Sequence, residues 1–269
     1  MKQAHSLEDL RTMFETNPRM FNIIEEPIDV ELQVKYFKRS QRLKKQVYKL
    51  EDVLARVPQL YDENIRVEEK RDILILLASF NDNVQAYRAL ETFWNTAAQG
   101  DVRPWAAMAY RESKMSLESS LLDEKQVLIS TGLGGKGYTL RYFICFIHNE
   151  NVEYTDVQQK ILRNELSFIF QQYQAECEKV EFSGRFAKVF GLIPFTAEVR
   201  EILTKVTDEC NQYGNFISPN FMVTNVKALD DDEIDLFLQT RELEQELANH
   251  LSDMGLNDVD FDFDDDDDE

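Results

Sequence analysis

The chain has 269 residues, of which 43% are hydrophobic and 11% aromatic, so it can bury a core without metals or disulfides. No apolar run approaches the roughly 18 to 20 residues that cross a bilayer, and residues 1–16 lack the apolar core of a signal peptide, so we expect a cytoplasmic protein without membrane insertion. The chain has three cysteines, Cys145, Cys177 and Cys210, and three histidines, all far apart in the sequence. This spacing argues against a disulfide framework and against a metal site, and we expect no metal and no cofactor.

The charge is unevenly distributed along the chain. The net charge is −20, but 18 of the 50 acidic residues and only one of the 30 basic residues lie from Asp230 onwards. That segment carries −17, whereas the preceding 229 residues hold 29 basic and 32 acidic side chains, a net charge of −3. The acidity therefore belongs to a C-terminal segment attached to a nearly neutral body.

The N-terminal half is predicted to be helical. A short helix begins after Ser6 and ends by Pro18, and a longer one begins after Asp29, its expected N-cap, and continues to about Lys49. The residues expected on the inward side of the longer helix are Leu32, Tyr36, Leu43, Val47 and Leu50. Apolar spacing predicts three more helices, over residues 67–80, 84–97 and 101–121.

A row of basic residues follows the longer helix. Its members, spaced three or four residues apart with no acid among them, are Lys35, Lys38, Arg42, Lys45 and Lys49. This spacing places them on one helix face, where they can neutralise the phosphates of RNA or DNA or contact an anionic surface. Two alternatives are a solvated helix face and a docking site for the acidic segment of the same chain.

The sequence GDVRPWAAMAY at residues 100–110 resembles the second helix of a HEAT-like (armadillo-type) repeat, with an Asp, then Val-Arg, then small residues at helical spacing. Residues 84–95 would be the first helix of that pair. The resemblance covers about 30 residues and implies a binding surface for proteins or nucleic acids. No family resemblance extends over the whole chain, and an irregular helical bundle is the alternative for this half.

Four of the nine glycines lie between Gly132 and Gly137 and satisfy G-x-G-x-x-G. In nucleotide-binding folds such glycines open a helix, but here a strand-like run follows from Tyr138 to Ile147. We therefore expect a glycine-rich hairpin between residues 127–130 and 138–147. A candidate anion-binding loop is the alternative, formed by Gly132, Gly134, Gly135, Lys136 and Gly137.

The rest of the body is predicted to alternate strands and helices. A helix is expected over residues 157–173, paired strands over residues 179–182 and 186–193, a helix capped by Thr196, and a final strand region over residues 216–226. This order predicts an α+β domain with an antiparallel or mixed sheet and helices on one face. No nucleophile motif, kinase motif or distinctive pair of carboxylates occurs in it, so the sequence favours binding over catalysis.

The acidic segment is predicted to begin with a helix over residues 230–252 and to become disordered after Gly255. Leu236, Leu243, Leu247 and Leu251 form the apolar stripe of that helix. The candidate partner-binding residues beyond it are Phe261, Phe263, Asp264, Asp265, Asp266, Asp267 and Asp268. Aromatic anchors beside acids suit a basic partner with a small apolar pocket.

These features predict a helical region over residues 1–123, an α+β domain over 124–229, an acidic amphipathic helix over 230–254 and a disordered tail over 255–269. The leading hypothesis is a non-enzymatic regulatory protein whose tail engages a basic protein or masks the basic surface of the body. One alternative is an RNA-binding or ribosome-associated factor that uses residues 35–49. Another is a phosphate-dependent or nucleotide-dependent enzyme that uses the glycine hairpin.

Overall fold

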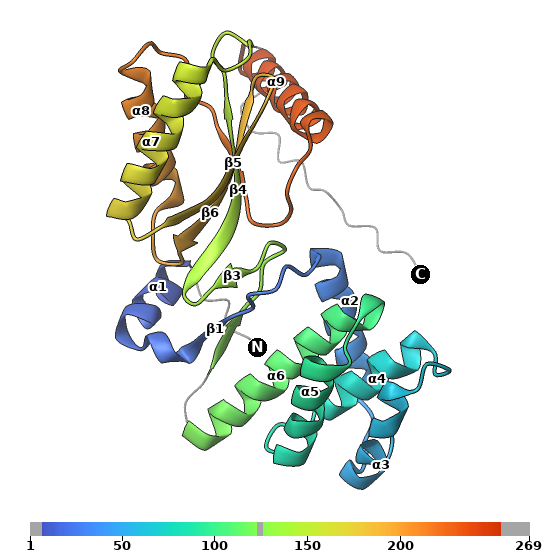
Figure 1. Cartoon of the computed structure of the whole chain (residues 1–269). Helices are drawn as coiled ribbons and strands as arrows, with labels where there is room; N and C mark the ends of the chain where they lie inside the picture. Colours follow the sequence, from blue (N-terminus) through green and yellow to red (C-terminus); the bar gives the residue numbers. More distant parts are fainter. Residues whose placement is uncertain (1–6, 123–125, 254–269) are drawn as a thin grey trace. The chain divides into compact units, whose positions relative to one another are not determined.

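The computed structural model describes residues 7–122 and 126–253, and over these residues the fold is α+β, as the sequence predicts (Figure 1). The helices are α1 (Leu7–Thr16), α2 (Val30–Leu43), α3 (Leu50–Leu54), α4 (Val67–Ala78), α5 (Val84–Thr96), α6 (Arg103–Leu122), α7 (Asp156–Gln172), α8 (Val199–Asn211) and α9 (Asp231–Asp253). Short 3-10 helices cover Pro18–Met20, Val57–Tyr61 and Gly100–Val102. The strands are β1 (Phe21–Ile23), β2 (Val127–Ile129), β3 (Gly135–Lys136), β4 (Thr139–Ile147), β5 (Glu176–Ser183), β6 (Phe186–Pro194) and β7 (Met222–Thr224).

The main sheet is antiparallel and is built around β4. Its strand order is β3-β4-β6-β5, and β7 pairs with β4 as well. β5 and β6 form a hairpin in which Ser183 pairs with Phe186, so the intervening Gly184 lies in the turn and takes a φ of +52°. The positive φ explains the glycine, because other residues rarely adopt that conformation. The sequence located this hairpin correctly.

Helices α7 and α8 lie side by side on one face of the sheet (Figure 1). Alternate residues of β4 point towards them, and Ile144 and Phe146 are fully buried in the same core cluster as Leu162 and Leu166 of α7. Helix α7 begins with the capping box of Thr155 and Gln158. The apolar spacing predicted for α7 is thus confirmed, because the buried positions are those that recur at helical intervals.

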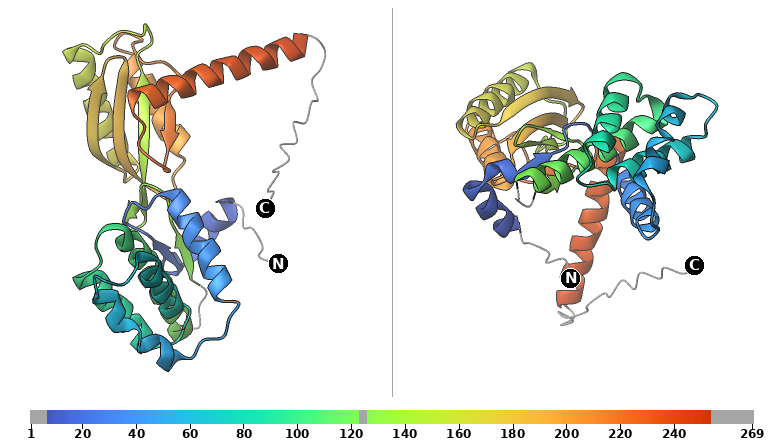
Figure 2. Two further views of the ribbon diagram at one scale, coloured as in Figure 1. Left: turned by 90° about the vertical axis from the view of Figure 1, so that its right-hand side faces the viewer. Right: turned by 90° about the horizontal axis from the view of Figure 1, so that it is seen from below.

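Helices α2 to α6 pack around a second hydrophobic cluster (Figure 2). Its centre is α4, where Ile73, Leu74, Leu76 and Leu77 are buried as predicted. Helices α5 and α6 pack against each other and against α4. Their bounds match the helices expected there, whereas the HEAT-like interpretation of the pair stays a prediction.

The segment before α2 contacts the sheet region across the expected boundary at residue 123. Strand β1 pairs in parallel with β2, and Phe14 of α1 makes edge contacts with Tyr138 and Phe195 at centroid distances of 5.1 and 5.8 Å. Arg11 also forms an ion pair with Glu198. The described residues up to Ala228 therefore form one compact unit that contains both hydrophobic clusters.

Two predictions about the region around the main sheet are wrong. The strand at residues 127–129 does not pair with β4 across the glycines but with β1, so the hairpin is the shorter pair β3 and β4. Helix α8 begins after Glu198, which makes no side-chain cap, rather than at Thr196. For the strand, a contact with a distant segment overrides the local pattern, because β1 supplies a partner for β2.

A second unit begins at Leu229 and contains α9. Asp230 caps this helix through a reciprocal pair of hydrogen bonds, in which the Glu233 amide donates to Asp230 and the Asp230 amide donates to Glu233. This capping explains why the helix starts where the sequence predicts. The predicted tail over residues 255–269 lies outside the described residues. Within residues 7–122 and 126–253, no helix has the length and apolarity required to cross a membrane.

Candidate functional site

Helix α2 carries the basic residues singled out in the sequence. Its N-terminus is capped by Asp29, whose Oδ1 accepts from the Leu32 amide at 3.1 Å, so this N-cap prediction is confirmed. The inner face buries Tyr36, whose hydroxyl donates to Glu112 of α6 at 2.6 Å. Burial and the neighbouring Glu112 carboxylate raise the pKa of Tyr36 well above its usual value, so it stays protonated. These contacts fix which face of α2 is exposed.

The helix is shorter than predicted, and this divides the basic row. Helix α2 ends at Leu43, so Lys45 and Lys49 leave the face that holds Lys35, Lys38 and Arg42. The chain turns because Leu43, Tyr48 and Leu50 all pack on the helical core, whereas Val47, which the helical spacing placed inward, is 99% exposed. A straight helix could not direct these three apolar side chains to the same core. Lys45 and Lys49 are exposed, and Lys49 precedes the first turn of α3.

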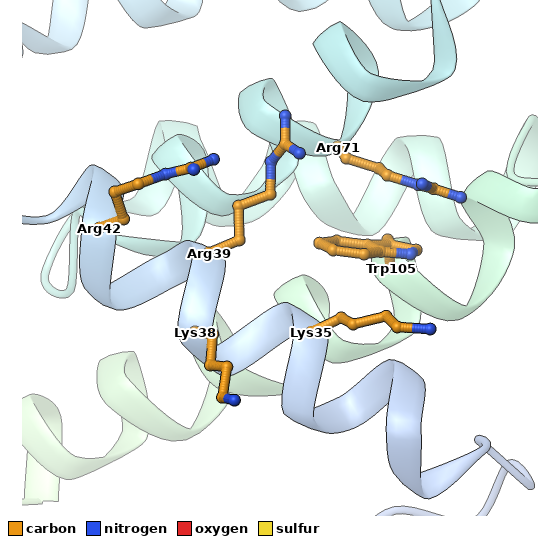
Figure 3. A pocket seen from close by; sticks show the side chains of 6 residues that line it. All are labelled: Lys35, Lys38, Arg39, Arg42, Arg71 and Trp105. Carbon is orange, nitrogen blue, oxygen red and sulfur yellow. The ribbon is translucent and has the colours of Figure 1, made fainter. Parts of the chain in front are cut away.

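The basic face of α2 lines an open pocket of about 510 Å³, here called the basic pocket (Figure 3). Its lining residues are Lys35, Lys38, Arg39, Arg42, Arg71 and Trp105. Four come from α2, Arg71 comes from α4, and Trp105 comes from α6. All the charged residues in the lining are basic. The sequence identified Lys35, Lys38 and Arg42, but it gave no signal for Arg71 and Trp105, which only the packing of α4 and α6 brings to this place.

The cations of the basic pocket differ in how well they are neutralised. Arg39 forms a bidentate pair with Asp72 at 2.5 and 2.9 Å, and this hydrogen bonding raises the pKa of Arg39. Lys35 lies 3.7 Å from Glu31, and Arg71 lies 3.9 Å from Glu68. Within the described part of the chain, no acid forms an ion pair with Lys38 or Arg42. These two positive charges are therefore available to an external anion.

Trp105 supplies the apolar part of the pocket wall. The guanidinium carbon of Arg71 lies 4.9 Å from the centroid of the indole ring, a cation–π contact, and Figure 3 shows the ring between the side chains of Arg71 and Lys35. Trp105 is only 4% exposed. Stacking on the buried ring restricts the guanidinium, so less side-chain entropy is lost when Arg71 binds an anion.

A row of apolar residues lies on α2 beside the basic face. Val30, Val34 and Phe37, spaced four and three residues apart, are 37%, 47% and 42% exposed. Helical spacing places this apolar row next to Lys38, about a quarter of a turn around the helix. The exposed surface of α2 thus combines an apolar strip with a cationic strip. No role for this apolar row follows from the sequence pattern alone.

The glycine loop uses its backbone amides internally. The Gly135 amide donates to the carbonyl oxygen of Glu25, the Gly137 amide donates to the Glu25 carboxylate at 3.2 Å, and the Leu133 amide donates to Asn225. Lys136 forms an ion pair with Glu176 at 3.1 Å. Glu25 and Glu176 contact the loop through these interactions. They hold it against the segment before α2 and against β5. Phosphate contact at this loop stays a prediction.

The three cysteines lie outside the basic pocket. Cys145 and Cys210 are buried, and burial raises the pKa of Cys210 to about 12. Among the described residues, no group of three or more His, Cys, Asp or Glu side chains is arranged to hold a metal ion. The candidate partner-binding residues of the tail, Phe261, Phe263 and Asp264 to Asp268, lie outside the described residues. The basic pocket is therefore the best-defined candidate site in the described part of the chain.

No protein-family model matches this chain, and no curated protein matches it in sequence.

Proposed function

We propose that this protein is an interaction protein that binds the phosphate groups of RNA at the basic pocket. The observation that supports the proposal is that Lys38 and Arg42 have no ion-pair partner in the described chain, although the body carries a net charge of −3. In a body with more acids than bases, such cations would readily find internal partners. Their placement beside three further cations suits an external anion.

The lining chemistry favours phosphate over other ligands. Arginine guanidinium groups offer paired donors that match two phosphate oxygens, and lysine adds a point charge. A phosphodiester chain can contact several cations in succession, whereas a single carboxylate cannot. Each contact releases condensed counterions, so the affinity should fall steeply as salt is added.

The same lining favours binding over catalysis. Its five charged groups are Lys and Arg side chains, and the indole of Trp105 takes no proton. General bases are most often His, Asp or Glu side chains, and none of these lines the pocket. The proposed role is therefore the capture of an RNA chain.

The test measures binding of a fluorescently labelled single-stranded RNA to the full chain by anisotropy at low salt. In the double variant Lys38→Glu/Arg42→Glu, two attractive contacts become repulsive, and we expect at least a roughly tenfold loss of affinity. The matched control is Lys160→Glu/Arg200→Glu, which makes the same change in net charge at exposed positions on α7 and α8.

The control variant should bind RNA almost as the wild type does. Equal losses in both variants would show that only the net charge matters, and this would contradict a site at the basic pocket. Absence of RNA binding by the wild-type chain at low salt would overturn the proposed function. Circular dichroism should show the same helix content in all three proteins.

A further inference from the structure

The chain contains two exposed helix faces that are amphipathic and opposite in charge. One is the surface of α2, where the apolar row of Val30, Val34 and Phe37 lies beside Lys38 and Arg42. The other is α9, which exposes Leu236, Phe237 and Leu243 by 64%, 49% and 65%. Residues 231–253 contain eight acidic residues and one basic residue.

We propose that α9 of one copy of this protein packs along α2 of a second copy. In this contact Leu236 and Leu243 cover the apolar row, while the acids of α9 face Lys38 and Arg42. Burying exposed apolar side chains provides the driving force, and the opposite charges select the partner and its register.

The spacing of the two apolar rows agrees. Leu236 and Leu243 are seven residues apart, and so are Val30 and Phe37. Seven residues of helix span about 10.5 Å, so both rows present their outer apolar side chains at the same separation along the helix axis. Val34 lies within the row of α2, and Phe237, the residue after Leu236, extends the apolar surface of α9 to one side of its row. A helix therefore fits this surface better than an extended chain does.

The opposite charges of α2 and α9 favour the pairing of α9 with α2 over the pairing of two identical helices. Two copies of α9 would place acid against acid, and two copies of α2 would place Lys38 and Arg42 against their counterparts, so both like pairings are repulsive. Packing α9 on α2 avoids both repulsions. Each chain carries one of each surface, so the dimer that we propose is twofold symmetric and makes two identical contacts.

Two copies of the α9–α2 contact bury more surface area than one, as a stable interface requires. Specific interfaces bury at least about 1,200 Å² in total, which is more than a single short helix pair supplies. Doubling the contact by symmetry brings the buried area towards that range. The dimer would cover Lys38 and Arg42, so we expect dimerisation and RNA binding to exclude each other. The proposed dimer contact holds whether or not the chain binds RNA.

Sedimentation equilibrium of the full chain, from micromolar to near-millimolar concentration at low ionic strength, tests the proposal. We expect a monomer–dimer equilibrium that weakens as salt is added, because the charges that select the partner are then screened. A monomer at every concentration would overturn the proposal, even if the chain binds RNA.

A charge-swap experiment identifies the surfaces. Lys38→Glu/Arg42→Glu reverses the charge at two positions of α2, and Asp232→Lys/Asp235→Lys reverses it at two positions of α9, so each variant alone should lose the dimer. When the two variants are mixed, the unchanged α9 of the first variant meets the unchanged α2 of the second. At the other contact, the new lysines of α9 meet the new glutamates of α2. We expect the mixture to form a heterodimer, which also shows that both variants are folded.

Apolar variants and a control complete the test. Leu236→Ser/Leu243→Ser and Phe37→Ser should each raise the dimer dissociation constant by at least roughly tenfold, because each removes exposed apolar area from the contact. Lys160→Glu/Arg200→Glu should dimerise as the wild type does. A wild-type dimer that all these variants leave unchanged, or a mixture of charge-swapped variants that stays monomeric, would assign the contact to other surfaces and overturn the proposal.

Discussion

The backbone carbonyl oxygen of Glu25 lies 2.2 Å from the position that a Cβ atom would take at Gly134. Gly134 also adopts a φ of +70°, which L side chains rarely take. The loop that resembles a nucleotide-binding motif in sequence is thus tightly packed against the segment that leads into α2. The close approach of two backbones explains this glycine.

Replacing Gly134 by Ala should destabilise the protein by about 3 kcal/mol, since the added methyl group clashes with backbone that cannot move independently. Gly137→Ala is the matched control, because Gly137 has a similar φ of +57° but no atom within 4 Å of its Cβ position. The control should lose only about 1 kcal/mol from the unfavourable φ. Urea unfolding measures both values, and equal losses would contradict the packing role.

The salt dependence of RNA binding should report individual contacts at the basic pocket. Lys38→Gln and Arg42→Gln each remove one cation without adding a negative charge. For a single-stranded ligand, each loss should reduce the slope of log K against log salt by about 0.7. Lys160→Gln should leave the slope unchanged. Slopes that are the same in all three variants would show that RNA does not contact Lys38 or Arg42.

The Arg141–Glu178 pair should make stability depend on pH in the acid range. Glu178 accepts from Arg141 at 2.6 and 2.9 Å, and these hydrogen bonds lower the pKa of Glu178. A lowered carboxyl pKa in the folded state means that the stabilisation is fully present above the usual Glu value of about 4.3. It is lost as the pH falls through the lower folded-state pKa.

A double-mutant cycle of Arg141→Met and Glu178→Gln measures this coupling. Both side chains are partly exposed to solvent, which screens their charges, so we expect about 1 kcal/mol or less at neutral pH. Well below the folded-state pKa the coupling should be close to zero, because protonated Glu178 no longer carries a charge. A coupling energy that is independent of pH would contradict the assigned ion pair.

The cysteines should react slowly with thiol reagents in the folded protein. Burial raises the pKa of Cys210 to about 12 and also raises the pKa of Cys177, so little thiolate is present near neutral pH. Cys177 is less buried than Cys145 and Cys210, and we expect it to be modified first. Mass spectrometry after mild alkylation locates the modified residue. Rapid modification of Cys210 in the folded state would contradict the burial.

The phenylalanines of the tail should matter more than individual acids when a basic protein is captured. We expect Phe261→Ala/Phe263→Ala to reduce capture from a cell lysate more than Asp265→Asn/Asp267→Asn does, because aromatic anchors contribute apolar contact in addition to charge. A chain that ends at Gly255 provides the reference for complete loss. Equal losses from both double variants would contradict the anchor role.

The sequence by itself determined the local elements and the charge distribution. The buried positions of α4 and α7 and the turn at Gly184 were all predictable. Helical and strand spacing, capping and turn preferences act between residues close in the chain, so they can be read without the fold. The α+β class follows from the order of these elements, which the sequence also contains.

Only the tertiary structure decided how distant segments meet. It ended α2 at Leu43, and it brought Arg71 and Trp105 to the basic face of that helix. It also placed Gly134 against the backbone of Glu25, a close contact that the glycine pattern in the sequence does not reveal. These outcomes depend on burial and on hydrogen bonds between residues far apart in the chain. Spacing along a sequence gives only the face on which a side chain lies, and the fold decides what that face meets.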